Sequence, residues 1–228
     1  MLKRKERIFI VENDERLRTR LTNWFEKKRC EVICMENLSF VLSEIESSVV
    51  DCLIIGENIP DRITASKKIA EADKNVRIIL LGDREEELQN LFQVLCIPRP
   101  LVAKHIGEEY YKNKLTLDSY EQVFSFGDFS FNNISRLLVF KDKTSQEENT
   151  RKLTKTESHI LLMLAQKKDT LVSREKIITR IWNENSWRNS RCLDVYITRL
   201  RSYLALDENI SIHTEQNKGF ILQEKKYL

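Results

Sequence analysis

The chain has 228 residues, of which 41% are hydrophobic and 32% are charged. This balance excludes a disordered chain and favours one large or two ordinary globular domains. No apolar run reaches the roughly 18 residues that a membrane span needs. The basic start precedes an apolar run of only four residues, Ile8–Val11, which is too short for a signal-peptide core, so we expect a cytoplasmic protein.

Five cysteines are scattered along the chain without a CxxC pair, and only three histidines accompany them. This pattern gives little support to a zinc site or a disulfide framework and fits a reducing cytosol. We interpret the cysteines as small buried hydrophobic residues and predict no metal and no cofactor. They are Cys30, Cys34, Cys52, Cys96 and Cys192.

Charge is distributed unevenly between the two halves. Residues 1–122 carry 20 Lys and Arg against 22 Asp and Glu, whereas residues 123–228 carry 18 against 13. A basic surplus in one half points to a nucleic-acid partner there, because phosphate contacts drive non-specific affinity.

Short apolar runs alternate with amphipathic stretches in the first half. Five strand–helix units in this length predict a doubly wound, flavodoxin-like parallel sheet with helices on both faces and a functional site at the carboxyl ends of the strands. The predicted strands are Ile8–Val11, Glu31–Met35, Cys52–Ile55, Val76–Leu81 and Val94–Ile97. The predicted helices are Asp14–Lys28, Leu38–Glu46, Thr64–Asp73, Asp83–Phe92 and Val102–Asn113.

The second half has a different order of elements. We place a linker at residues 117–122, between a domain over 1–116 and a domain over 123–228. Strands, three helices and a terminal hairpin predict a winged helix-turn-helix. The predicted strands are Phe124–Phe131, Leu137–Lys141, Ile210–Thr214 and Gly219–Leu222, with a polar loop at Lys143–Asn149. The predicted helices are Lys155–Gln166, Arg174–Trp182 and Ser190–Leu204.

The last predicted helix has one apolar and one polar face when its residues are placed 100° apart. An exposed face of arginines and short polar side chains suits the major groove, where Arg can bond a guanine edge and Thr a base or phosphate. The apolar face holds Leu193, Ile197, Leu200 and Leu204; the opposite face holds Arg191, Val195, Thr198 and Ser202, flanked by Arg199 and Arg201.

The segment 191–201, RCLDVYITRLR, resembles the recognition helix of the OmpR/PhoB family of response regulators. Leu153–Glu157, Ser173–Ile178, Trp182 and Lys218–Phe220 match that family's DNA-binding domain in order and spacing. The resemblance implies a transcription regulator that binds double-stranded DNA. By position, it implies DNA contacts from Arg191, Thr198, Arg199 and Arg201 in the helix and from Thr214, Gln216 and Lys218 in the wing.

Two further features of this half follow from the resemblance. The wing departs from the family pattern, because residues 215–218, EQNK, replace a stretch that normally carries an arginine and a glycine. Residues 183–189 correspond to the loop through which the family contacts RNA polymerase or a neighbouring protomer.

The first half resembles the receiver domain of the same family. Receivers hold Mg²⁺ with paired acidic residues after the first strand and carry an Asp nucleophile after the third. A hydroxyl residue and a Lys follow the fourth and fifth strands and bind the phosphoryl group. The corresponding positions in this sequence are Glu12, Asn13, Gly56, Gly82 and Arg99, so Gly56 stands where the Asp nucleophile belongs. Because glycine cannot accept a phosphoryl group, the sequence predicts a receiver without phosphorylation chemistry.

Two charged residues near this pocket leave alternatives open. Glu57 is one residue beyond the acceptor position and would turn to the other face, unless a bulge lets it supply a permanent negative charge. Arg99 has Glu12, Asp14 and Glu57 as candidate partners, or is exposed without a partner.

The resemblance also implies a homodimer through the face over residues 83–113, formed by the predicted fourth helix, fifth strand and fifth helix. The acidic run Glu85–Glu87 there either pairs across the dimer or is solvated.

Three other interpretations remain. A conventional phosphorylated regulator is disfavoured by Gly56. A protein-interaction module that keeps a winged-helix shape stays open. An enzyme is not predicted, because no glycine-rich phosphate loop is present and His105, His159 and His213 lie in three separate elements.

Overall fold

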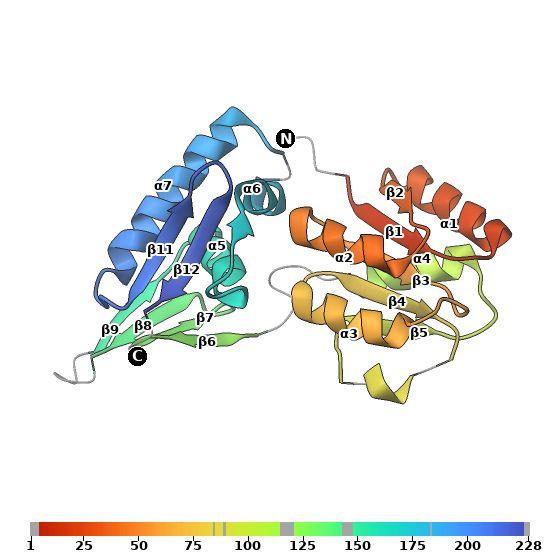
Figure 1. The fold of residues 1–228 in the computed structure, drawn as a ribbon, viewed down its shortest axis with the longest axis horizontal. Helices are drawn as coiled ribbons and strands as arrows, with labels where there is room; N and C mark the ends of the chain where they lie inside the picture. The colour runs from red at the N-terminus through yellow and green to blue at the C-terminus, as the bar shows by residue number, and fades with distance from the viewer. Residues whose placement is uncertain are drawn as a thin grey trace. The chain divides into compact units, whose positions relative to one another are not determined.

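The computed structural model describes residues 5–83, 85–88, 90–114, 121–142, 148–182 and 184–225. The chain divides into two compact units, Met1–Thr116 and Leu117–Leu228 (Figure 1). Residues 117–120 of the predicted linker lie outside the described residues. None of the described helices is both long and apolar enough to cross a membrane.

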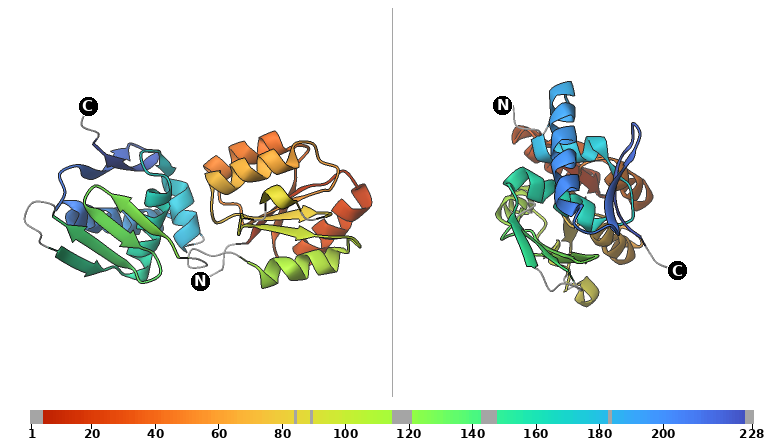
Figure 2. Two further views of the ribbon diagram at one scale, coloured as in Figure 1. Left: turned by 90° about the horizontal axis from the view of Figure 1, so that it is seen from below. Right: turned by 90° about the vertical axis from the view of Figure 1, so that its left-hand side faces the viewer.

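The first unit is the predicted doubly wound α/β fold, with a parallel sheet in the order β2-β1-β3-β4-β5. Helices α1 and α4 cover one face and α2 and α3 the other (Figure 2). The strands are β1 Arg7–Val11, β2 Glu31–Cys34, β3 Cys52–Ile55, β4 Arg77–Leu81 and β5 Val94–Ile97. The helices are α1 Glu15–Lys27, α2 Leu38–Ser47, α3 Arg62–Ala72 and α4 Ala103–Lys112.

Apart from the charged first residues Arg7, Glu31 and Arg77, the strands are apolar, because helices cover both faces of the sheet. Strands β3 and β4 are buried at every residue. Ile8 and Ile10 contribute to the core beneath α1 and α4, whereas Phe9 and Val11 contribute to the core beneath α2 and α3. This burial fixes the register of the sheet and therefore the residues that follow each strand at its carboxyl end.

The prediction of a helix over Asp83–Phe92 is wrong. The structure has only a short 3-10 helix, η1 Glu86–Leu88, between β4 and β5, while residues 84 and 89 lie outside the described residues. The connection between Leu81 and Val94 has only twelve residues, 82–93. A ten-residue α-helix, about 15 Å long, would leave one residue at each end to reverse the chain. The crossover is too short for a full helix.

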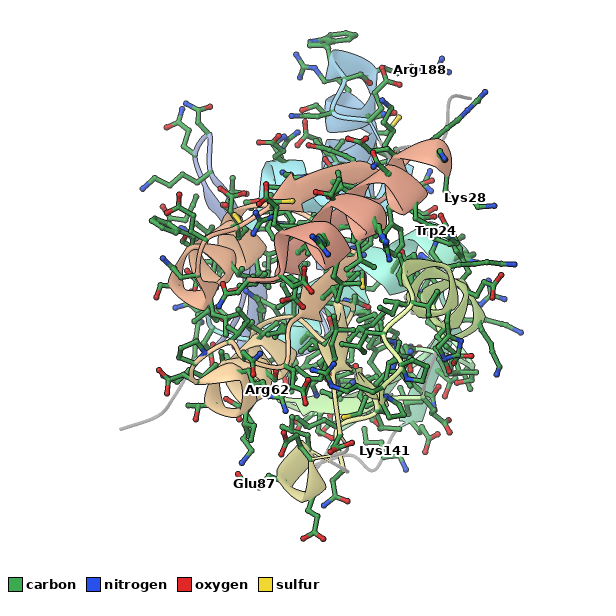
Figure 3. All side chains as sticks on the ribbon, turned by 90° about the vertical axis from the view of Figure 1, so that its right-hand side faces the viewer. Trp24, Lys28, Arg62, Glu87, Lys141 and Arg188 are labelled. Carbon is green, nitrogen blue, oxygen red and sulfur yellow. The ribbon has the colours of Figure 1, made fainter. Side chains whose placement is uncertain are left out.

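The acidic run in this crossover contacts α3. Arg62 forms an ion pair with Glu85 and donates to the carbonyl of Leu81 at 2.7 Å, and Lys67 pairs with Glu87 at 2.5 Å. Figure 3 labels Arg62 on α3 and Glu87 on η1. Glu85 and Glu87 are therefore engaged within the first unit rather than left for a second protomer.

The cysteines are all free, but they are not all buried. Cys30 and Cys52 are buried, as predicted, and desolvation raises the pKa of both thiols. The prediction was wrong for Cys34, which is exposed, and Cys96 and Cys192 are half-buried.

The second unit has the predicted winged-helix fold around one hydrophobic core. A four-stranded antiparallel sheet precedes three helices, and a three-stranded sheet in the order β10-β12-β11 completes the unit. The strands are β6 Val123–Phe126, β7 Phe129–Asn132, β8 Leu137–Lys141, β9 Glu148–Lys152, β10 Val172–Ser173, β11 Ile210–Glu215 and β12 Gly219–Glu224. The helices are α5 Lys155–Gln166, α6 Arg174–Trp182 and α7 Trp187–Leu204.

Two sequence predictions in the first of these sheets need correction. The single strand predicted over Phe124–Phe131 is a hairpin of β6 and β7, because Gly127 turns the chain with a φ of 54°. Strand β9 begins inside the predicted loop Lys143–Asn149, of which residues 143–147 lie outside the described residues. Every residue of β9 is exposed, so the sequence has no alternating apolar pattern to reveal it.

The packing of α1 on α4 depends on Gly107. A Cβ at this position would lie 2.1 Å from Cζ3 of Trp24, whose ring also has the Lys28 ammonium 5.7 Å from its centroid (Figure 3). We expect Gly107→Ala to lower the free energy of unfolding of the full chain by about 1–3 kcal/mol, because the added methyl group overpacks the interface.

Urea unfolding measures this effect. Adding Trp24→Leu, which removes the clashing ring, should make the effect of Gly107→Ala smaller, and exposed Glu108→Ala on the same helix serves as the control. Unchanged stability of Gly107→Ala would contradict this account of the α1–α4 contact.

Candidate functional site

Helix α7 presents the polar face that the sequence predicts. Leu193, Ile197, Leu200 and Leu204 are its buried residues, which confirms the predicted core face. The helix begins at Trp187, three residues before the predicted start, and the Ser186 side chain caps it by accepting from the Asn189 amide at 3.3 Å. The exposed side holds Arg191, Val195, Thr198, Arg199, Arg201 and Ser202.

The arginines on this face differ in their contacts. The Arg191 guanidinium lies 5.4 Å from the centroid of the Trp187 ring. Arg199 lies 5.7 Å from the Tyr196 ring centroid and 3.9 Å from the buried Glu157 carboxylate. Both guanidinium groups thus lie beside aromatic rings on the exposed face of α7, and Arg199 is also ion-paired with Glu157.

Arg201 is engaged with the wing. Its Nε and Nη2 donate to the carbonyl of Ile212 at 2.9 and 2.7 Å, and Nη2 also donates to Oγ1 of Thr214 at 2.6 Å. The sequence predicted a DNA contact from both Arg201 and Thr214, but gave no sign that the two side chains bond to each other.

Thr198 uses its hydroxyl proton within the helix. Oγ1 donates to the carbonyl of Asp194 at 2.9 Å. In this rotamer, the oxygen can only accept a hydrogen bond from outside, so it suits a base amino group rather than a phosphate, which has no donor.

The wing is the hairpin of β11 and β12. Thr214, Gln216 and Lys218 are exposed, as a DNA-contacting hairpin requires. Asn217 occupies the left-handed region with a φ of 60°, and the amide of Lys218 donates to the carbonyl of Glu215 at 3.0 Å. A short polar turn therefore replaces the arginine and glycine of the family pattern.

The sequence analysis missed Arg174, which joins α6, α7 and β12. Its guanidinium donates to Ser190 Oγ at 2.9 Å, to Ser190 O at 2.7 Å and to the Asp194 carboxylate at 2.7 Å, and it lies 5.6 Å from the Phe220 ring centroid. A positive charge in the first turn of a helix is unfavourable to the helix dipole. That mismatch was the available signal that Arg174 has a tertiary partner.

The predicted polymerase loop is shorter than expected. Residue 183 lies outside the described residues, and Trp187, Arg188 and Asn189 belong to the first turn of α7. Trp187 is 76% exposed.

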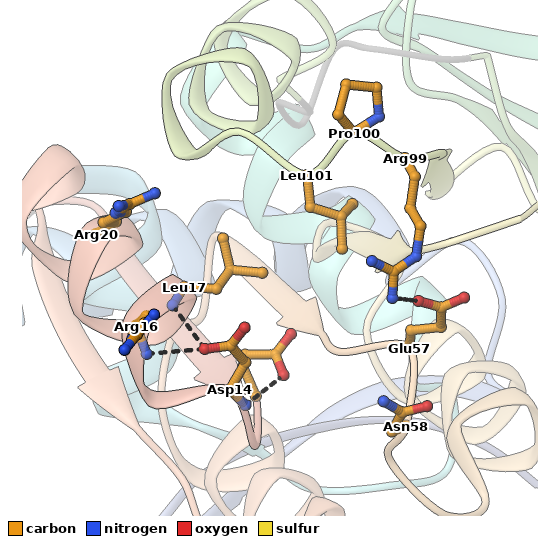
Figure 4. A pocket seen from close by; sticks show the side chains of 10 residues that line it. Asp14, Arg16, Leu17, Arg20, Glu57, Asn58, Arg99, Pro100 and Leu101 are labelled. Carbon is orange, nitrogen blue, oxygen red and sulfur yellow. Dashed lines mark hydrogen bonds and ion pairs between the residues drawn. The ribbon is translucent and has the colours of Figure 1, made fainter.

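In the first unit, a pocket of about 660 Å³ opens at the carboxyl ends of the strands (Figure 4). Glu12, Glu57 and Arg99 line it together with Asp14, Asn58 and Leu101. Asn13 does not line it and faces a second groove, beside α2 and α3.

The space that a side chain at position 56 would need is filled by a neighbouring carboxylate. A Cβ at Gly56 would lie 2.6 Å from Oε2 of Glu12, and Glu12 is only 7% exposed. Oε1 of Glu12 accepts from the Asp14 amide at 2.9 Å, and the Asp14 carboxylate caps α1 through the amides of Arg16 and Leu17. The sequence shows the glycine at position 56 but not that Glu12 occupies the space of its absent side chain.

Glu57 and Arg99 resolve an alternative that the sequence left open. Arg99 Nη2 pairs with Glu57 Oε2 at 2.6 Å (Figure 4), with neither Glu12 nor Asp14 as its ion-pair partner in the described structure. Glu57 turns into the pocket beside Gly82, whose φ is 107° and whose added Cβ would lie 2.9 Å from Glu57 Cγ. The absence of side chains at Gly56 and Gly82 thus leaves space for the side chains of Glu12 and Glu57.

The donor set does not fit the Mg²⁺ ion of a receiver. Gly56 offers no side-chain oxygen, and the Glu12 and Asp14 carboxylates accept from backbone amides. Within the described ranges, no three His, Cys, Asp or Glu side chains are grouped to hold a metal ion.

Restoring an aspartate at position 56 should therefore destabilise the chain. Gly56→Asp places a second carboxylate against Glu12, so the free energy of unfolding in urea should fall by about 1–3 kcal/mol. Asn58→Asp adds the same charge at an exposed neighbouring site and is the matched control. A Gly56→Asp chain as stable as the Asn58→Asp chain would show that the space is not filled as described.

Residues 147–222 match the family described as "Transcriptional regulatory protein, C terminal". The chain is 26% identical to response regulator protein GraR of Staphylococcus epidermidis over 227 residues, covering 95% of this chain and 99% of that protein. GraR of Staphylococcus saprophyticus is 27% identical over 221 residues, covering 94% and 98%. The response regulator DrrB, described as a Thermotoga maritima OmpR/PhoB homologue, is 19% identical with a TM-score of 0.39, covering 96% of this chain and 99% of that structure. Residues 147–222 thus match a transcriptional regulatory domain, and the chain is similar to response regulators over nearly its full length.

Proposed function

We propose that the chain binds specific duplex DNA sequences through α7 and the β11–β12 hairpin, as a dimer, without phosphorylation of its first domain. The observation that carries this proposal is the Glu12 carboxylate beside Gly56, in the space where a receiver holds its acceptor aspartate. Gly56 has only a hydrogen atom as its side chain, so this position offers no nucleophile that could accept a phosphoryl group.

The exposed face of α7 supports the DNA-binding part. Arg191 and Arg199 offer two-pronged donors for guanine, and Thr198 offers an acceptor for the amino group of adenine or cytosine. Gln216 and Lys218 stand at the exposed end of the hairpin, where Lys218 suits a phosphate contact. The helix therefore has groups for bases and the wing has groups for the backbone.

The Glu57–Arg99 ion pair supports independence from phosphorylation. In a phosphorylated receiver, a lysine at the position of Arg99 contacts the phosphoryl group. Here the Arg99 side chain is 70% exposed and is already paired with a carboxylate of the same domain. The positive group after β5 thus has a permanent anionic partner, and no covalent modification is needed to supply one.

The dimer part is supported by apolar exposure on the face over residues 83–113. Phe92 is 46% exposed and Val102 is 51% exposed, so burying them against a second copy would be favourable. Among the described residues between β4 and β5, only the short η1 stands where the family has a helix, and Glu85 and Glu87 pair with α3. The contact proposed here is therefore apolar. RNA polymerase is a proposed partner of residues 183–189, where exposed Trp187 supplies an anchor.

DNA binding by the full chain should not change with phosphoryl donors. We expect the Kd for genomic fragments, including the chain's own promoter, to stay within about twofold after treatment with acetyl phosphate and Mg²⁺. Arg199→Ala should weaken binding by about 1–3 kcal/mol and relax the base preference, because a guanine contact is lost, whereas exposed Lys152→Ala on β9 should do neither.

The other outcomes separate the competing interpretations. Binding that appears only after treatment would point to a conventional phosphorylated regulator. No salt-dependent duplex binding under either condition would favour a protein-interaction module.

The dimer is tested by sedimentation equilibrium. Replacing both Phe92 and Val102 with Ser should raise the dimer dissociation constant at least about tenfold, because apolar area is lost from the contact. Phe40→Ser on α2, where the side chain is 56% exposed outside this face, should leave it unchanged. The proposed face would be contradicted if the wild-type chain were monomeric at the concentrations of the DNA-binding measurements. It would also be contradicted if Phe40→Ser raised the dimer dissociation constant as much as the double substitution at Phe92 and Val102.

A further inference from the structure

We propose that Arg201 is a positioning residue rather than a base reader: it holds the wing against α7 and orients the Thr214 hydroxyl as a donor to DNA. This inference rests on the proposed DNA binding and assigns a different role to a residue that the family motif places on DNA. The three hydrogen bonds from Arg201 to β11 carry it.

Strand β11 has one open edge, and Arg201 bonds to it. The sheet order β10-β12-β11 leaves β11 paired on one side only. The amide of Lys225 bonds to the carbonyl of Asn209 at 2.8 Å, and alternate residues pair in the same way along the ladder. The carbonyl of Ile212 therefore points away from β12, and the Arg201 guanidinium satisfies it with two donors.

Thr214 lies on the face of β11 that turns toward α7. Ile210, Ile212 and Thr214 alternate onto one face of the strand, and the two isoleucines are buried in the core that includes α7. Thr214 lies beyond the buried part and is exposed. Its side chain thus stands between the core and the proposed DNA surface, with Arg201 beside it.

The polarity of the Arg201–Thr214 bond determines what Thr214 can offer. A guanidinium has only donors, so Oγ1 of Thr214 must accept, and the hydroxyl proton remains available for another partner. Phosphate oxygens and the minor-groove atoms adenine N3 and thymine O2 are acceptors. Arg201 thereby orients the Thr214 hydroxyl as a donor to DNA. The positive charge of the guanidinium strengthens the hydrogen bond from Arg201 to Thr214.

Thr198 has the opposite polarity, because its proton is already donated to the carbonyl of Asp194. The two threonines implied to contact DNA would therefore read opposite groups: Thr198 accepts and Thr214 donates. The amino-acid motif alone cannot distinguish these roles, since both residues are exposed threonines.

A double-mutant cycle in the full-length chain tests the inference. The probe is a duplex recovered from a random-core pool by repeated binding to the wild-type chain, and the readout is Kd by fluorescence anisotropy at several salt concentrations. Thr214→Val and Arg201→Gln should each weaken binding about tenfold, since each removes a charge-assisted bond. The double variant should bind the duplex as tightly as the single variant with the lower affinity, because both changes remove the same oriented donor.

Conservative variants separate positioning from charge. Thr214→Ser keeps the hydroxyl and should bind like the wild type. Arg201→Lys keeps the charge and should leave the salt slope unchanged, yet bind as weakly as Arg201→Gln, because an ammonium lacks the planar fork that reaches both Ile212 and Thr214. Arg191→Gln combined with Thr214→Val is the control and should give additive losses, because Arg191 shares none of these contacts.

Each contrary result overturns the inference. Additive losses in the Arg201–Thr214 cycle, or full rescue by Arg201→Lys, would mean that Arg201 acts on DNA directly. Equal binding of Thr214→Val and Thr214→Ser would mean that the hydroxyl is not used. A wild-type chain that recovers no duplex from the pool would overturn the proposed function itself, and this inference with it.

Discussion

The close approach of the Glu12 carboxylate to Gly56 shapes the pocket at the carboxyl edge of the first sheet. The Glu12 carboxylate occupies the space that any side chain at position 56 would enter, and the Asp14 amide fixes it there. Asp14 in turn caps α1, so the residues after β1 define both the pocket and the start of a helix. Gly82 and Glu57 repeat the arrangement after β4. The glycine at position 56 and the Glu12 carboxylate beside it thus form one packing arrangement.

The second domain uses arginine for two different purposes. Arg174 donates hydrogen bonds to residues of α7, and Arg201 donates hydrogen bonds to the open edge of β11. Arg191 and Arg199 instead lie beside aromatic rings on the exposed face. Arg201 thus links the exposed side of α7 to the wing, whereas Arg191 and Arg199 make no hydrogen bond to the wing that the structure describes. A rigid helix–wing unit lowers the ordering cost of binding, which favours specific recognition.

Sequence periodicity predicted most of the fold, because buried strands and amphipathic helices have clear patterns in residues such as Ile8–Val11 and Leu193–Leu204. It failed where length or exposure decided the structure: the crossover over residues 82–93 is too short for the expected helix, and β9 is exposed throughout. The resemblance to a receiver drew attention to Gly56 and Arg99, but their neighbours Glu12 and Glu57 depend on tertiary packing. The bonds of Arg201 likewise join residues that are distant in the motif, so no pattern could indicate them.

Intact-mass spectrometry after incubation with acetyl phosphate and Mg²⁺ tests the central claim most directly, with a receiver that retains its aspartate treated in parallel. The account predicts that the parallel receiver gains one phosphoryl group and that this chain gains none, since Gly56 offers no nucleophile and Glu12 fills its place. A hydroxylamine-sensitive gain of one phosphoryl group on this chain would contradict the account, because it would require an acyl phosphate on a carboxylate that the structure assigns to packing or ion pairing.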